Sequence, residues 1–447
     1  MPSYTGHSVV AADSRCFYGQ CAASTPLRRT PKQFPQSARL LPGVHPNQNF
    51  RSTFLYTTYF VQNFLLAIPI PELHAPTLKT GISMNKTLCT AAVLSCTAAA
   101  AHAQGSVTLY GLIDASIQYT TNQGGGKTWA MSSGTTRGSR FGLLGREDLG
   151  GGTQAIFRLE NGFDVTDGSL GQGGLMFGRQ AYVGIQNDRW GALTFGRQYE
   201  SMVDYVAHLT AADWSVYMEH PGDMDLTNRG VRVDNSVKYT KTYGAFTGSA
   251  LYSFGGQAGS FGKDSMWSIG GSYDDGPLYV GFGMTYARQP GDRSAGTFWK
   301  ATNSAIGQFV TVAHSFLTVG GGAAYRFGPV KLGGDITSTT YKAGFEGQNV
   351  NFMNYEVNGV YFFTPALSAG LGLTYTDGKI DANDGDPRYL QYNATATYSL
   401  SKRTDLYAFA TFQRAMGDAA VAQVTQFIEP SSNQKQASIG VGLRHSF

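Results

Sequence analysis

The sequence predicts an all-β protein, a 16-stranded antiparallel transmembrane β-barrel. Three observations predict it. The chain of 447 residues holds 57 glycines, only 14% of its residues are Asp, Glu, Lys or Arg, and 13% are aromatic, whereas soluble domains are about 25% charged. The apolar residues do not form the runs of about 20 that a bundle of membrane helices needs. From Gln104 onward, segments of about ten residues alternate between apolar and polar side chains, as strands with lipid on one side and water on the other do.

The first 103 residues differ from the rest in composition. They hold 8 Lys and Arg against 2 Asp and Glu, and all four cysteines, so the remainder is nearly neutral and offers no nucleic-acid surface and no thiolate chemistry. Met84-Asn-Lys86, a small apolar stretch and Ala101-His-Ala103 predict a secretory signal peptide over residues 84–103. We expect residues 1–83 to be a non-native or disordered upstream extension and residues 104–447 to form the barrel. A membrane anchor at 54–70 and a lipidated Cys96 are the alternatives.

Sixteen segments show the two-residue period of a strand. In residues 389–400, for example, Leu, Tyr and Ala alternate with Gln, Asn, Thr and Ser. The predicted strands are 107–119, 139–147, 154–163, 177–185, 192–198, 231–240, 246–254, 266–273, 278–288, 316–327, 330–341, 355–363, 367–376, 389–400, 405–413 and 436–447.

The connections alternate in length, which indicates a barrel with short periplasmic turns and long extracellular loops. All seven prolines after residue 103 lie in predicted connections, as required of residues that cannot donate to a strand ladder. A soluble all-β sandwich or propeller is the alternative, but it would expose polar rather than apolar faces. A barrel of this size leaves an aqueous channel inside.

Short motifs run through the barrel domain from end to end. They are Val107-Thr-Leu-Tyr-Gly111, Ser139-Arg-Phe-Gly142, Glu147-Asp-Leu-Gly150, Phe157-Arg-Leu-Glu-Asn-Gly-Phe163, Phe177-Gly-Arg-Gln-Ala-Tyr-Val-Gly184, Phe195-Gly-Arg-Gln198, Arg232-Val-Asp-Asn-Ser236, Tyr398-Ser-Leu-Ser-Lys-Arg-Thr404 and Val441-Gly-Leu-Arg-His445. On these motifs the chain resembles the Gram-negative general diffusion porins of betaproteobacteria and neisserial bacteria.

The resemblance implies a homotrimer of outer-membrane barrels that let small hydrophilic solutes and ions diffuse passively. It also implies that the third long loop, roughly 199–230, folds into each pore. No cofactor, resident metal or catalytic residue is expected. The expected partners are outer-membrane lipid, lipopolysaccharide (reached through divalent ions at the acidic run 381–386) and the barrel assembly machinery, with no nucleic acid.

Charged side chains at the narrowest point are the candidate site, because fixed charges select among solutes in a pore. Alternation places Arg140, Arg158 and Arg232 on the polar face, with Lys238 beside them, and the loop contributes carboxylates that would oppose them. Arg179 and Arg197 match family positions, yet alternation puts them among apolar neighbours; a bulge or a place at the rim would reconcile this. The loop carboxylates are Glu200, Asp204, Asp213 and Glu219. Opposed charges leave the ion preference open.

The last strand alternates regularly and ends on an aromatic residue. Leu443, His445 and Phe447 resemble the assembly signal of bacterial outer-membrane barrels. Two other function classes remain as alternatives: a barrel enzyme such as a lipase, which would need a Ser and His pair on the lipid side that is not visible, and a surface adhesin that uses the long loops.

Overall fold

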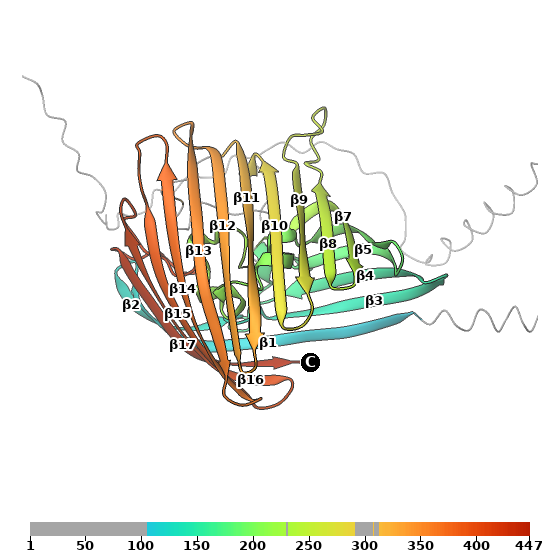
Figure 1. Cartoon of the computed structure of the whole chain (residues 1–447), viewed down its shortest axis with the longest axis horizontal. Coiled ribbons are helices and arrows are strands. Elements are labelled where there is room, and N and C mark those ends of the chain that lie inside the picture. The colour runs from blue at the N-terminus through green and yellow to red at the C-terminus, as the bar shows by residue number, and fades with distance from the viewer. Residues whose placement is uncertain (1–104, 229–230, 291–306, 308–312) are drawn as a thin grey trace, which may run out of the picture. The chain divides into compact units, whose positions relative to one another are not determined.

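A computed structural model describes residues 105–228, 231–290, 307 and 313–447, and the predicted extension and signal peptide lie outside these residues. Seventeen strand segments form one antiparallel sheet (Figure 1). They are β1 (Ser106–Gln123), β2 (Gly126–Ser133), β3 (Arg140–Gly150), β4 (Thr153–Gly162), β5 (Gln180–Asn187), β6 (Gly191–Gln198), β7 (Val233–Tyr243), β8 (Phe246–Ser253), β9 (Met266–Asp274), β10 (Leu278–Arg288), β11 (Ser315–Phe327), β12 (Val330–Phe345), β13 (Gln348–Phe362), β14 (Leu367–Ile380), β15 (Arg388–Ser399), β16 (Thr404–Met416) and β17 (Lys435–Ser446).

The sheet closes on itself into a barrel with sixteen strand positions. β1 pairs with β17 on one side, from Leu112 opposite Ser446 to Thr120 opposite Ser438. On its other side, the first part of β1 pairs with β3 and the later part with β2, so β2 and β3 share one position around the barrel. Every described strand except β2, which pairs only with β1, has a strand neighbour on both sides, so closure removes most of the free edges that would otherwise invite aggregation. The predicted fold is confirmed, and only β2 was not predicted.

Short turns gather at one rim and most of the longer connections at the other. The short turns are residues 151–152, 188–190, 244–245, 275–277, 328–329, 363–366 and 400–403. The prediction of a long connection between residues 341 and 355 is wrong: β12 and β13 continue beyond the predicted ends and meet in a tight turn at Glu346 and Gly347, both with positive φ. Polar side chains on both strands hid this extension in the sequence. No proline lies in any described strand.

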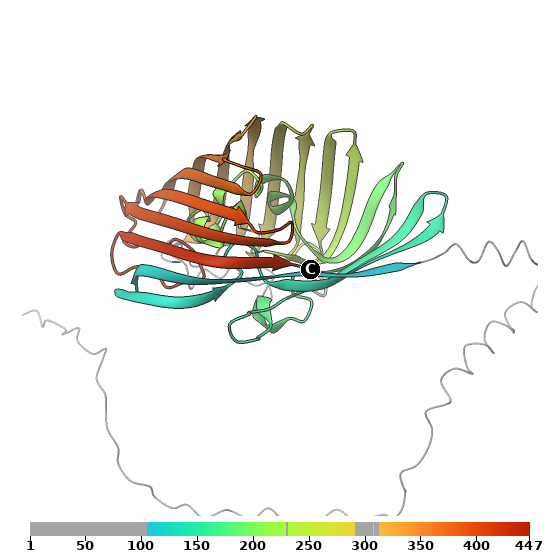
Figure 2. The same cartoon turned by 90° about the horizontal axis from the view of Figure 1, so that it is seen from below.

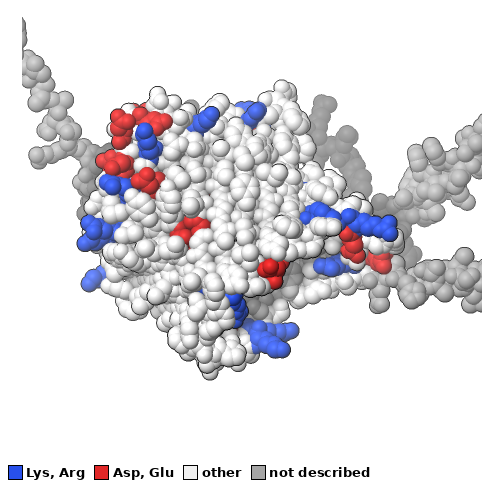
Figure 3. Space-filling model, viewed as in Figure 1, with Lys and Arg blue, Asp and Glu red and all other residues white. Residues whose placement is uncertain are grey.

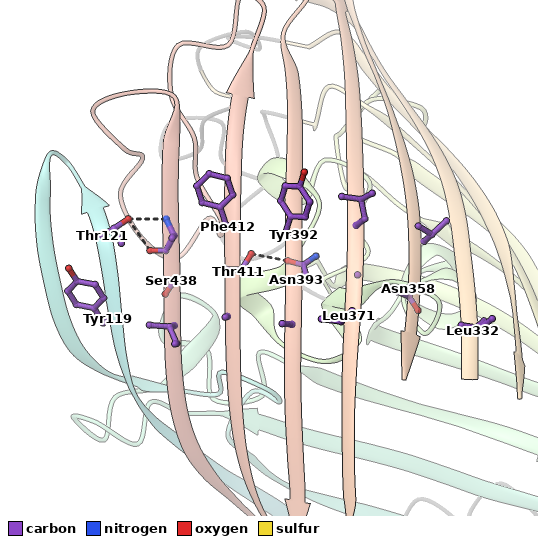
Figure 4. A pocket seen from close by; sticks show the side chains of 17 residues that line it. Tyr119, Thr121, Leu332, Asn358, Leu371, Tyr392, Asn393, Thr411, Phe412 and Ser438 are labelled. Atoms are coloured by element: carbon purple, nitrogen blue, oxygen red, sulfur yellow. Dashed lines mark hydrogen bonds between the residues drawn. The ribbon is translucent and has the colours of Figure 1, made fainter. Parts of the chain in front are cut away.

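The two faces of the sheet have opposite chemistry. Figure 4 shows a shallow groove on the outer wall, where Leu371 and Tyr392 come from neighbouring strands and are 72% and 51% exposed. Asn393 and Thr411 point to the other face, are each 3% exposed and share a hydrogen bond of 2.8 Å. Exposed apolar side chains outside and hydrogen-bonded polar ones inside are what a barrel in lipid requires. Figure 3 agrees, since the middle of β10 and β11 is uncharged and the charges lie mostly at the margins.

The connection between β6 and β7 lies inside the barrel over its described residues 199–228 and 231–232 (Figure 2), and it is called the constriction loop below. Its short helical turns are η2 (Met202–Val206), η3 (Ala211–Asp213), η4 (Val216–Met218) and η5 (Pro221–Asp223), and α3 (Gly171–Gly174) lies in an earlier connection. No described helix is both long and apolar enough to cross a bilayer. Much of the buried apolar surface belongs to the loop, with Met202, Val206 and Met224 fully buried against inner-wall residues.

Candidate pore constriction

Hydrogen bonds to the inner wall hold the constriction loop across the lumen. At its start, the Ser201 amide donates to the Ser268 hydroxyl at 2.9 Å. In the middle, Asn358 of β13 donates to the Leu209 carbonyl oxygen at 2.6 Å. Further on, Gln391 of β15 donates to the Glu219 carbonyl oxygen at 3.0 Å. Because these wall partners lie on β9, β13 and β15, the loop narrows the channel on that side.

Glycines on the inner wall make room for the loop. A Cβ at Gly281 of β10 would lie 2.0 Å from the Tyr205 carbonyl oxygen, and one at Gly320 of β11 would lie 2.8 Å from the Met202 methyl carbon. Gly281 and Gly320 therefore admit the first turn of the loop inside the barrel. A larger residue at Gly281 would push that turn into the channel.

A cavity of ≈ 1210 Å³ remains between the loop and the wall formed by β1 to β5. Of the predicted site residues, Arg140, Arg158, Arg179, Arg232 and Asp204 line it. Arg197, Lys238, Glu200, Asp213 and Glu219 do not line it, although some of them bind residues that do.

Two wall arginines, Arg158 and Arg179, and the last residue of the loop, Arg232, are linked through one carboxylate and two tyrosines. Arg158 donates to the Tyr110 hydroxyl at 2.7 Å and to the buried Glu160 at 3.2 Å. Arg179 donates to the other oxygen of Glu160 at 2.8 Å. Arg179 and Arg232 both donate to the Tyr199 hydroxyl, at 3.0 and 2.9 Å.

Tyr199, at the start of the loop, is held between two guanidinium groups. Burial alone would raise its pKa, but Arg179 and Arg232 overcome this and lower the pKa to about 8. The phenol is therefore a constriction group that titrates just above neutral pH.

Arg140 differs from the other wall arginines. Its guanidinium lines the cavity but makes no hydrogen bond or ion pair with any described residue. It is therefore a fixed positive charge directed at the water in the channel.

For Arg179 and Arg197, the strand alternation predicted an outward side chain, whereas the family positions predicted a place in the constriction. The structure resolves this conflict differently for each of them. Arg179 comes directly before β5, so it lies at the rim, where the strand rule does not apply and its side chain turns inward to Glu160. Arg197 lies where the β6–β7 register shifts between Gly196 and Gln198, which is a bulge. Its Nε donates to the Gly178 carbonyl oxygen at 2.7 Å, and it pairs with Asp234, so it stabilises the rim.

The loop carboxylates fall into two groups. Asp204 and Asp213 are partly exposed, and each forms an ion pair: Asp204 with Lys238, and Asp213 with Arg137 at 2.9 Å. Glu200 is fully buried and accepts hydrogen bonds from the loop amides of residues 202 and 203.

Glu219 is fully buried as well and binds Asn228 and the Gln426 amide rather than the channel. Burial raises the pKa of Glu200 to about 7 and that of Asp223 to about 8, and burial beside Asp223 raises the pKa of Glu219 well above its usual value. The loop therefore presents far less negative charge to the channel than its composition suggests.

Sequence reasoning did not select Glu160, Tyr199 or Arg137. For Glu160 a signal existed, because the alternation that places Arg158 inward also places the residue two positions later inward. Tyr199 and Arg137 lie in connections, where side-chain direction follows no period, and no sequence signal identified them.

The predicted assembly signal lies at the seam of the barrel. The Phe447 amide donates to the Gly111 carbonyl oxygen at 3.0 Å, and the Gly111 amide donates back at 3.1 Å. Leu443 and Phe447 are exposed on the outer face, and His445 pairs in register with Ile113 of β1.

A closed barrel with an apolar exterior, a charged interior and a loop across its lumen defines a channel-forming protein of the bacterial outer membrane. Residues 90–418 match the Gram-negative porin family, and the chain belongs to that family. It is 32% identical over 403 residues to an outer membrane porin protein of Bordetella pertussis, a match that covers 81% of this chain and 100% of the relative. It is 26% identical over 383 residues to outer membrane porin protein 32 of Delftia acidovorans, with the same coverage of both chains.

More distant matches agree in fold. Major outer membrane protein P.IB of Neisseria meningitidis serogroup B is 25% identical over 354 residues, covering 77% of this chain and 95% of that protein. The solved anion-selective porin from Comamonas acidovorans superimposes with a TM-score of 0.63 at 22% identity, covering 77% of this chain and 100% of that one. The protein thus forms a water-filled channel in the outer membrane for the diffusion of small hydrophilic solutes and ions.

Proposed function

We propose that the channel prefers anions, because the constriction holds an excess of fixed positive charge. Among the described residues, five arginines line the cavity: Arg137, Arg140, Arg158, Arg179 and Arg232. The carboxylates that line it are Glu160, Asp164, Asp204 and Asp223. The raised pKa of Asp223, about 8, leaves it mostly uncharged at neutral pH, so the positive charges outnumber the negative ones.

Water-filled constrictions with walls of low dielectric constant concentrate the field of such charges. An anion gains electrostatic energy in this field, while a cation loses it. The description of the Comamonas acidovorans protein as anion-selective agrees in direction with this proposal.

The test is the reversal potential of the purified protein in planar bilayers under a KCl gradient. We expect a potential of the sign given by chloride permeating faster than potassium. A reversal potential of zero, or one of the opposite sign, at low salt would rule out the anion preference. Channels with no conductance at all would contradict channel formation itself.

The protein acts as a channel without catalysis and as a homotrimer. The matched OmpT of Vibrio cholerae, TM-score 0.57 at 15% identity, is described as a trimer form, which supports the trimer. The connection 163–179 also carries exposed Leu170, Leu175 and Met176, which suit contact with a neighbouring protomer or lipid. Native mass spectrometry in detergent should give three chains, and a monomer would contradict the trimer.

The remaining partners are the outer-membrane environment and its assembly route. Lipopolysaccharide binds near the acidic connection 381–387, and the barrel assembly machinery recognises β17 through Leu443, His445 and Phe447. Residues 84–103 direct secretion and are removed after Ala103, leaving residues 1–83 outside the working protein. The family match begins at residue 90, which supports leaving residues 1–83 outside the porin domain. Mass spectrometry of the amino terminus tests it, since a mature chain starting before Met84 would contradict it.

A further inference from the structure

Three acidic side chains and one histidine meet where the constriction loop touches the wall of β12 and β13. His220 and Asp225 come from the loop, Asp335 from β12 and Glu356 from β13. One ligand atom from each of His220, Asp335 and Glu356 lies within 4.8 Å of the others. All four side chains are nearly inaccessible, with exposures of 0 to 4%. The cluster lies outside the arginine-lined cavity and plays no part in the proposed ion preference.

Asp335 and Glu356 are direct partners across the β12–β13 ladder. Like charges in this position repel each other, and a buried pair of carboxylates is costly unless positive charge lies between them. Asp335 and Glu356 therefore lie side by side on the inner wall, close to His220 of the loop.

The oxygens of Asp335 lack partners. Both carboxylate oxygens are buried, and neither accepts a hydrogen bond within the described structure. A buried carboxylate is normally hydrogen-bonded, paired or bound to a metal. Glu356 differs, because one of its oxygens accepts from the Ala211 amide at 2.6 Å and from Asn358 at 2.6 Å. Its other oxygen, Oε2, accepts from the Thr374 hydroxyl at 3.0 Å and lies 3.2 Å from Nε2 of His220.

Asp225 orients the histidine ring. It lies 2.6 Å from Nδ1 of His220 and also accepts from Thr337 at 2.6 Å, which fixes the carboxylate in turn. When Nδ1–H donates to Asp225, the lone pair of Nε2 points toward Glu356, whose Oε2 is 3.2 Å away. In metal sites, a ligating histidine commonly donates its other ring nitrogen to a carboxylate in this way.

We propose that His220, Asp335 and Glu356 bind one divalent transition-metal cation of the zinc type, which fastens the constriction loop to the barrel wall. Zinc accepts imidazole nitrogen and carboxylate oxygen at about 2.0–2.2 Å, and such bonds set neighbouring tetrahedral ligand atoms about 3.4 Å apart. The 3.2 Å between His220 and Glu356 fits this spacing. Calcium and magnesium are less suitable, because they take oxygen ligands.

A bound cation would compensate the unpartnered and like-charged carboxylates of the cluster. It gives Asp335 a partner, separates the two cross-strand carboxylates and leaves Asp225 as the hydrogen-bond acceptor of the ring. Because His220 lies within the loop and the two acids lie in the wall, the bound ion joins the two and limits movement of the loop.

Zinc binding to the purified channel tests the proposal. The full chain, produced without a polyhistidine tag and folded in detergent, is treated with a chelator, equilibrated with zinc and analysed by elemental mass spectrometry. We expect one zinc per chain, a higher unfolding temperature with zinc than without, and visible absorption bands of tetrahedral type when cobalt replaces zinc.

Variants separate this site from surface binding. Asp335→Asn and Glu356→Gln, which keep side-chain shape, should each weaken zinc binding at least tenfold, and Asp225→Asn should weaken it about tenfold or more through the ring orientation alone. Asp264→Asn is the matched control, because Asp264 is also 4% exposed with an unpartnered oxygen but belongs to no described cluster of metal-binding groups. It should bind zinc like the wild type.

Two results would overturn the site. The first is a wild-type chain that retains no zinc after equilibration. The second is equal zinc binding by the wild type and by Asp335→Asn or Glu356→Gln, which would place the metal elsewhere. Circular dichroism establishes that each variant compared has folded, and His220→Gln removes the loop ligand should both wall variants fail to fold.

Discussion

Replacing Arg140 by alanine should change ion preference without weakening the barrel. Its guanidinium lines the cavity and makes no hydrogen bond or ion pair with a described residue, and the buried Glu160, which it attracts, keeps Arg158 and Arg179 as partners without it. Because no hydrogen bond or direct ion pair is lost, the loss of stability should be small. The expected effect is therefore purely electrostatic.

Coulomb's law gives its size. A monovalent ion that passes about 7 Å from the charge in water interacts with it by about 0.6 kcal/mol. At 0.1 M salt, where the screening length is about 10 Å, this falls to about 0.3 kcal/mol. The charge favours an anion and opposes a cation by that amount, so its loss should lower the chloride-to-potassium permeability ratio about threefold. At 1 M, with a screening length of about 3 Å, the effect should nearly vanish.

The assay is the reversal potential in planar bilayers under KCl gradients near these two concentrations. Arg140→Lys keeps the charge and should keep the ratio. Lys402→Ala removes one positive charge from an exposed turn, away from the cavity, and should leave the ratio unchanged. A threefold drop confined to Arg140→Ala and to low salt is the predicted pattern. An unchanged ratio at low salt, or an equal change in Lys402→Ala, would refute the role of Arg140.

Three further predictions test other parts of the constriction and the seam. The anion preference should weaken as the pH rises through about 8, because the Tyr199 phenol, whose pKa is lowered to about 8, then becomes negative. Reversal potentials measured from pH 6 to pH 10 test this. Tyr199→Phe should reduce the change in reversal potential to the part that ionisation of Asp223 contributes. Glu160→Gln should increase the anion preference in the same assay and lower the free energy of unfolding in urea by about 3 kcal/mol, because buried Arg179 loses its carboxylate partner. Phe447→Ala should reduce the amount of folded protein in the outer membrane, as measured by membrane fractionation, whereas Val441→Ala, also outward on β17, should not.

The barrel could be predicted from the sequence because its two faces meet different solvents. Each strand must alternate, and an alternation of about ten residues is visible without knowing any contact. Each of the sixteen predicted segments overlaps an observed strand. β2 was not predicted, because it is a short strand of eight residues whose alternation is weak. It shares its place beside β1 with β3, from which residues 134–139 separate it.

The site could be predicted only in part. Arg140 and Arg158 lie in regular strands, so the period gave the direction of their side chains. Arg179 and Arg197 required knowledge of a strand end and a bulge. The directions of the loop carboxylates depend on hydrogen bonds to residues far away in the chain, such as Gln426 for Glu219. A sequence read by local period contains no signal for such contacts.

The buried carboxylates change the expected physics of the channel. Opposed rows of wall arginines and loop acids would produce a field directed across the channel. In the structure, however, Glu200 and Glu219 are buried away from the cavity. Asp204 and Asp213 form ion pairs with basic side chains of the protein. The field therefore comes mainly from the arginine wall, while the loop acids hold the loop in position. Because the two tasks fall to different residues, substitutions in the wall should change which ions pass, and substitutions of the buried loop acids should change how wide and how steady the channel is.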